Sequence, residues 1–65
     1  MNVLDYLSSS EKTSIPCAIS RALVAEINGY DLQVELDLIV DEMVSNHWNR
    51  SAANGIVNKL VASHR

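Results

Sequence analysis

The stretch 31–48, DLQVELDLIVDEMVSNHW, constrains the fold more than any other part of the chain, because it contains neither glycine nor proline. At 100° per residue, most of its large apolar residues share one face of a helix. That face consists of Leu32, Leu36, Ile39, Val40, Met43 and Val44. Val34 and Leu38 project from the opposite side. A helix that is apolar on two sides is normally buried on two sides. We therefore expect a helix over residues 32–48 that is the middle of a bundle or a seam between subunits.

A second helix is predicted just before this stretch, over residues 15–27. Ser14 suits its N-cap, and Pro16 would then lie in the first turn, where a missing N–H costs nothing. Asn28 and Gly29 supply a stop, since glycine favours the left-handed conformation that commonly follows a helix. The polar residues 8–14 are predicted to form a loop.

The last part of the chain predicts a third helix over residues 51–64, with Ser51 as its N-cap. Its apolar residues fall on one face: Ala53, Ile56, Val57, Leu60 and Val61. A further short helix is expected over residues 2–8. Because so few residues are not helical alone, tertiary contacts must hold it.

These elements predict an all-α fold: a single domain over residues 1–65, built as a small three-helix bundle with a short extra N-terminal helix. A domain of this size buries only about 60% of its unfolded surface. Cys17 is the only cysteine, so no disulfide within the chain can add stability. We therefore expect the chain to oligomerise, as a homodimer or with another protein. In the alternative, the N-terminal segment folds back and covers Val34 and Leu38.

Charge is distributed unevenly along the chain, whose net charge is −3. All eight acidic residues precede residue 46, whereas Arg50, Lys59 and Arg65 follow it without any acid. An acidic body with a basic end can orient a partner. It differs from the strongly basic profile of an autonomous nucleic-acid binder.

The N-terminal sequence does not resemble a signal peptide, because Asp5 interrupts its apolar residues and no basic leader precedes them. No run approaches the ~20 apolar residues of a membrane span. With one free cysteine, these features predict a cytoplasmic protein without a membrane partner.

Catalytic and metal-binding patterns are sparse. Cys17 with His47 or His64 would be the only nucleophile and base pair of this type, and we expect Cys17 to be buried and inert. Two histidines without a carboxylate at fixed spacing make a weak metal-ligand set. So short a chain also lacks room for a walled substrate pocket. We predict no enzyme activity, no catalytic residues, no cofactor, no metal and no small-molecule substrate.

The candidate partner-binding residues lie on the second face of the central helix. Val34 and Leu38 form an apolar centre, and Glu35, Asp41 and Glu42 surround it. An apolar centre with an acidic rim is typical of an interface for a basic protein surface; the alternative is a solvated face with two exposed aliphatic residues. The first interpretation predicts a small protein-interaction or regulatory module, of the size common among accessory proteins of phages and mobile elements.

The central and last helices resemble a helix-turn-helix in outline, which implies DNA binding as an alternative function. The last helix would be the recognition helix, and its contacts would be Arg50, Asn54, Asn58 and Lys59. Asparagine can read adenine, and lysine or arginine can meet phosphate or guanine. The chain departs from that family at His47 and Trp48, where the turn favours glycine, and the acidic central helix would repel phosphate.

Overall fold

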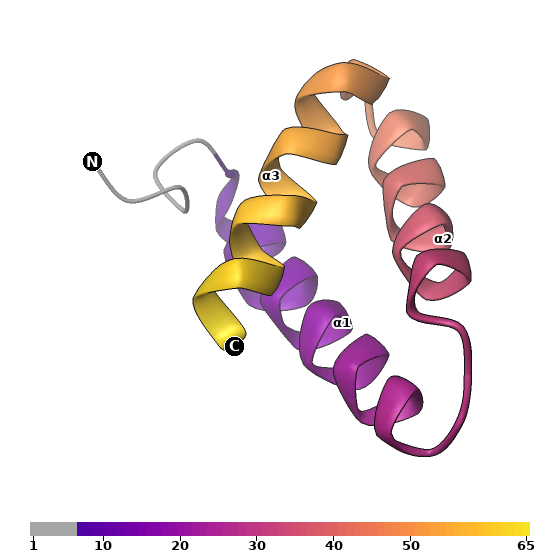
Figure 1. Ribbon diagram of the computed structural model, residues 1–65. Helices are drawn as coiled ribbons and strands as arrows, with labels where there is room; N and C mark the ends of the chain where they lie inside the picture. The colour runs from indigo at the N-terminus through magenta and orange to yellow at the C-terminus, as the bar shows by residue number, and fades with distance from the viewer. Residues whose placement is uncertain (1–6) are drawn as a thin grey trace.

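The structure of the protein is a computed structural model, in which residues 7–65 are described. Three helices follow one another: α1 (Ser9–Ile27), α2 (Leu32–Ser45) and α3 (Arg50–His64). Each packs against the other two, and no strand occurs in residues 7–65 (Figure 1). The predicted all-α three-helix bundle is confirmed.

The core forms where the apolar faces of the three helices meet. Ile19 of α1, Val40 of α2 and Val57 of α3 are its largest fully buried side chains. The other buried residues are Leu7, Ile15, Ala22, Leu36, Met43, Ala53, Ile56 and Leu60. The predicted core face of the central helix is therefore the one that the other two helices cover.

Helix α1 begins six residues earlier than the sequence predicted, so the expected loop over residues 8–14 and the expected N-cap at Ser14 are wrong. Ser8 is the N-cap: its hydroxyl accepts the Glu11 N–H at 3.3 Å, and the Glu11 carboxylate accepts the Ser8 N–H at 2.9 Å. This reciprocal pair satisfies two backbone donors that a helix start leaves free. As a result, Pro16 lies inside the helix rather than in its first turn.

The connection between α1 and α2 follows the sequence prediction. Gly29 has a φ of +94°, and its N–H donates to the Glu26 carbonyl while the Tyr30 N–H donates to the Ala25 carbonyl. This pattern satisfies carbonyls at the end of α1 and needs a left-handed residue in the middle. Asp31 then caps α2, because its carboxylate accepts the Gln33 N–H at 3.0 Å.

Helix α2 ends at Ser45, three residues before the predicted end, and α3 begins at Arg50 rather than Ser51. The N-cap of α3 is Asn49, whose side chain accepts the Ser51 N–H at 2.8 Å. The helix predicted over residues 2–8 lies outside the described residues except for Leu7 and Ser8, which are not helical. Across residues 7–65, no helix combines the length and apolar character that a bilayer span requires.

Candidate functional site

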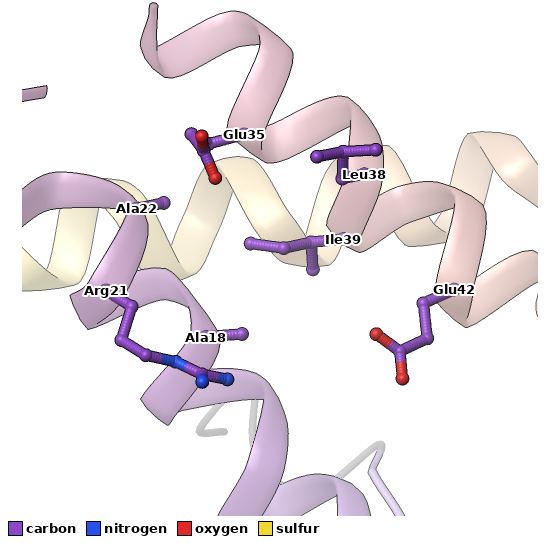
Figure 2. Close-up of a pocket in the computed structure, with 7 residues that line it drawn as sticks. All are labelled: Ala18, Arg21, Ala22, Glu35, Leu38, Ile39 and Glu42. Atoms are coloured by element: carbon purple, nitrogen blue, oxygen red, sulfur yellow. The ribbon is translucent and has the colours of Figure 1, made fainter. Parts of the chain in front are cut away.

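A hollow of about 280 Å³ lies between α1 and α2, and we call it the α1–α2 groove (Figure 2). It is lined by Ala18, Arg21, Ala22, Glu35, Leu38, Ile39 and Glu42. In Figure 2, α3 lies behind the two helices as seen from the groove. A smaller hollow of about 120 Å³ shares four of these residues and continues along the seam toward Asn46. The groove therefore follows the side of the helix pair that α3 leaves open.

The groove exists because α1 presents small side chains there. Ala18 and Ala22 are one helical turn apart, so α1 has no large side chain to fill the space beside Ile39. Leu38 stands at the edge of the groove with 59% of its surface exposed, and Val34, one turn earlier, is 53% exposed. The floor is therefore apolar and shallow, and a large apolar side chain projects beside it.

The two walls of the groove carry opposite charge. Arg21 lies on the α1 wall, and Glu35 and Glu42 lie on the α2 wall, with their charged ends near the space between the helices (Figure 2). Within residues 7–65, only Arg50–Asp41 and Arg65–Glu26 form ion pairs shorter than 4.0 Å. The three charges of the groove therefore have no ion-pair partner among the described residues.

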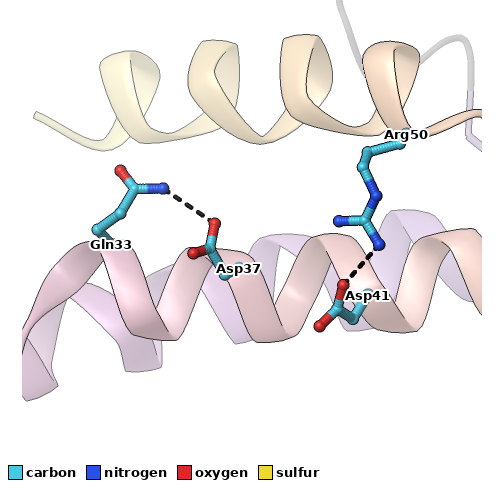
Figure 3. A network of polar contacts seen from close by, with 4 residues as sticks. All are labelled: Gln33, Asp37, Asp41 and Arg50. Atoms are coloured by element: carbon cyan, nitrogen blue, oxygen red, sulfur yellow. Dashed lines mark hydrogen bonds and ion pairs between the residues drawn. The ribbon is translucent and has the colours of Figure 1, made fainter.

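The structure separates Asp41 from the other predicted partner-binding residues. Its carboxylate accepts a hydrogen bond from the Arg50 guanidinium at 2.8 Å, on the side of α2 that faces α3 (Figure 3). One turn away, the Gln33 amide donates to Asp37 at 3.0 Å. Glu35, Leu38 and Glu42 thus line the groove, Val34 lies one turn from Leu38, and Asp41 belongs to a different surface.

The residues of the DNA-binding alternative lie on and beside the outer face of α3. Asn54, Asn58 and Lys59 are exposed there, whereas Arg50 is engaged with Asp41. Arg65, just after α3, pairs with Glu26 at 2.7 Å. Two of the three cations in this part of the chain are therefore already neutralised by acids, which weakens the attraction for phosphate.

Besides Arg65–Glu26, a second polar contact links parts of the chain that are far apart in sequence. The Trp48 indole N–H donates to Glu11, whose other carboxylate oxygen accepts the Ser8 N–H. The hydrogen bond from the Ser8 backbone, followed by that from Trp48, lowers the pKa of Glu11 below its ordinary value, because both favour the charged carboxylate. A polar hollow of about 320 Å³ adjoins this contact.

The sequence prediction missed two features of the site. Arg21 was not singled out, although it lies on α1 between Ala18 and Ala22. The Ser8 and Glu11 spacing matches a capping box, and this local signal marks the true start of α1. The contact of Glu11 with Trp48 has no local signal in the sequence.

The potential catalytic groups are placed differently from the prediction. Cys17 is exposed, so the expectation that it is buried is wrong. His47 is exposed, and the Nδ1 atom of His64 lies 2.8 Å from the Leu60 carbonyl of its own helix. Among residues 7–65, no group of three or more His, Cys, Asp or Glu side chains is placed to hold a metal ion.

Comparison with protein-family models, with curated proteins and with solved structures finds no match to this chain. The function is therefore inferred from the geometry of the site alone.

Proposed function

We propose that the protein is a small, non-catalytic interaction module that acts in the cytoplasm by binding a helical surface of another protein chain in the α1–α2 groove. The observation that carries the proposal is that exposed Leu38 lines a groove whose charged walls have no ion-pair partners in residues 7–65, with exposed Val34 one turn away on α2. Single exposed aliphatic residues are common on protein surfaces. An apolar centre with an open groove and free charges around it is more typical of an interface.

A helix is the element that fits this surface. The groove runs between two helices, and the small side chains on its α1 wall let the backbone of a partner helix come close. An occupying helix would bury Leu38 and Val34, and burial of a leucine or valine side chain contributes about 1.5–3 kcal/mol. The mechanism is occupancy: the protein covers a surface of its partner or completes an assembly.

The other exposed apolar residues provide an internal comparison. Val24, Ile27 and Tyr30 are exposed near the end of α1, and Ile27 is 83% exposed. They do not line the three hollows described above. If exposure alone promoted association, Ile27 would contact a partner chain at least as often as Leu38.

Site-specific photo-crosslinking tests the proposal. The full chain is produced in cells with p-benzoyl-phenylalanine at position 38 or, as the matched control, at position 27. After irradiation, we expect discrete covalent adducts from position 38 and none, or only diffuse labelling, from position 27. Mass spectrometry of each adduct identifies the bound chain.

Equal labelling from both positions, or no adduct from position 38, would contradict the proposal. The DNA-binding alternative predicts instead a salt-dependent mobility shift that the pair Asn58→Ala and Lys59→Ala removes. The pairing of Arg50 and Arg65 with acids makes it the weaker hypothesis.

A further inference from the structure

We infer that the chain that occupies the α1–α2 groove is a second copy of the protein itself. The inference rests on the proposed function, because it takes the groove to be a binding surface. It adds the identity of the partner and the way in which the two chains are arranged. Two properties of the groove, its shape and its charge, favour a second copy over a different protein, and the size of the chain is compatible with such a dimer.

The first property is shape. Leu38 projects at the edge of the groove, whereas Ala22 leaves space on the opposite wall and Ala18 lies one turn further along α1 (Figure 2). Rotation by 180° about an axis parallel to the groove leaves the position of each residue along the groove unchanged. It places the α1 wall of one copy opposite the α2 wall of the other. The α2 helix of each copy then lies against α1 of the other. Leu38 of one copy thus enters the space beside Ala22 of the second copy.

The second property is charge. The same rotation brings Arg21 of one copy against Glu35 and Glu42 of the other, and it does so twice. An interface with two-fold symmetry must be complementary to itself, and a surface with both charges on opposite walls meets this condition. A uniformly basic partner would place positive charge against Arg21. A uniformly acidic partner would place negative charge against Glu35 and Glu42. Like-charge contacts of this kind are unfavourable at an interface.

The size of the chain is compatible with this dimer. A stable interface of ordinary size removes about 800 Å² of surface from each partner. This chain exposes 4379 Å² in total, so such an interface would cover about a fifth of it. A four-helix arrangement of two α1–α2 pairs would bury Leu38, a large apolar residue that the bundle leaves outside its own core.

A charge-reversal experiment tests the arrangement. Sedimentation equilibrium on the purified full chain should give twice its mass of 7.2 kDa. Arg21→Glu should weaken dimerisation, and so should the double variant Glu35→Lys with Glu42→Lys, because each faces like charge across the two-fold axis. We expect an increase in Kd on the order of tenfold for each. Lys12→Glu, a reversal elsewhere on α1, is the control and should leave Kd unchanged.

An equimolar mixture of the two weakened variants should restore the dimer. In the mixed dimer, the glutamate introduced by Arg21→Glu in one chain faces the two introduced lysines of the other, and the unchanged Arg21 faces two unchanged glutamates. If the charges interacted only within one chain, each chain would keep its mismatch and the mixture would recover nothing. Recovery on mixing therefore distinguishes contacts between chains from contacts within a chain.

Leu38→Asp provides a second variant that does not depend on charge pairing, with Ile27→Asp as its matched control. Leu38→Asp should give the monomer mass with an unchanged helical circular dichroism spectrum, and Ile27→Asp should remain a dimer. A wild-type chain that is monomeric at every concentration would overturn the inference, as would a dimer that none of these groove variants weakens.

Failure of the inference can be told apart from failure of the proposed function. A monomeric chain whose position 38 crosslinks a different protein keeps the function and removes the second copy as the partner. A monomeric chain with no adduct from position 38 removes both.

Discussion

At the level of single residues, Glu11 joins the start of α1 to the connection between α2 and α3. One carboxylate oxygen accepts the Ser8 N–H, and the other accepts the Trp48 indole N–H. Both hydrogen bonds favour the ionised carboxylate, so the pKa of Glu11 is lowered in the folded protein. A group whose pKa is lowered by folding adds stability above its unfolded pKa, and that stability is lost as the pH falls through the folded pKa.

The corresponding prediction concerns Glu11→Gln. Glutamine can still accept the Ser8 hydrogen bond but carries no charge, so the variant should be less stable at pH 7 by about 0.3–1 kcal/mol, the usual contribution of a carboxylate near a helix N-terminus. The difference should disappear as the pH falls below the ordinary glutamate range. Urea unfolding at several pH values measures it.

Trp48 is the only tryptophan in the chain, so its fluorescence reports on this contact directly. The wild type should show an acid transition in the fluorescence that Glu11→Gln lacks. Glu35→Gln, a change on the α1–α2 groove, is the control and should keep the transition. Identical pH profiles for the wild type and Glu11→Gln would contradict the assignment.

At the level of the helices, α1 and α2 end in the same way. In α1, Gly29 occupies the left-handed position, and in α2 His47 occupies it with a φ of +79°. The His47 N–H donates to the Val44 carbonyl and the Trp48 N–H to the Met43 carbonyl, which matches the bonds at Gly29 and Tyr30. A residue with a Cβ atom is strained in this conformation by roughly 1–2 kcal/mol.

We therefore expect His47→Gly to stabilise the protein by about 1 kcal/mol, because glycine removes this strain. For a domain of this size, that corresponds to a rise in Tm of about 4–8 °C. The reverse change at the equivalent position, Gly29→Ala, should lower stability by a similar amount. Both are measured by thermal unfolding at one fixed protein concentration, and a lower Tm for His47→Gly would contradict the prediction.

At the level of the whole molecule, the basic end of the chain is tied to its acidic helices. Arg50 pairs with Asp41 of α2, and Arg65 pairs with Glu26 of α1. These ion pairs place two positive charges from the C-terminal part of the chain against acidic residues of α1 and α2. The open α1–α2 groove is left with free charges of both signs, which is why association is assigned to that side.

Association should couple to stability, because a partner that binds only the folded chain stabilises it. The Tm of the wild type should therefore rise with protein concentration. Leu38→Asp should show a Tm that does not depend on concentration, and Ile27→Asp should follow the wild type. Scanning calorimetry over a wide range of protein concentration makes the comparison; a constant wild-type Tm would argue against a dimer.

The sequence alone predicted three helices, the core faces of the central and last helices, and the turn at Gly29. These follow from local rules: apolar residues recur with the period of a helix, and glycine and aspartate mark helix ends. The start of α1 was misplaced because Pro16 suggested a first turn, whereas the Ser8 and Glu11 capping box begins the helix earlier. Both signals are local, but the Glu11 carboxylate of the capping box also accepts a hydrogen bond from Trp48, which is distant in sequence.

For the candidate site, periodicity placed Val34, Leu38, Glu35 and Glu42 on a second face of the central helix, but it grouped Asp41 with them. Only the tertiary structure assigned Asp41 to the side of α3 and placed Arg21 across the groove from the two glutamates. The physical reason is that spacing along a chain determines which residues share a helix face. Which residues meet across two helices depends on how the helices pack and rotate against each other.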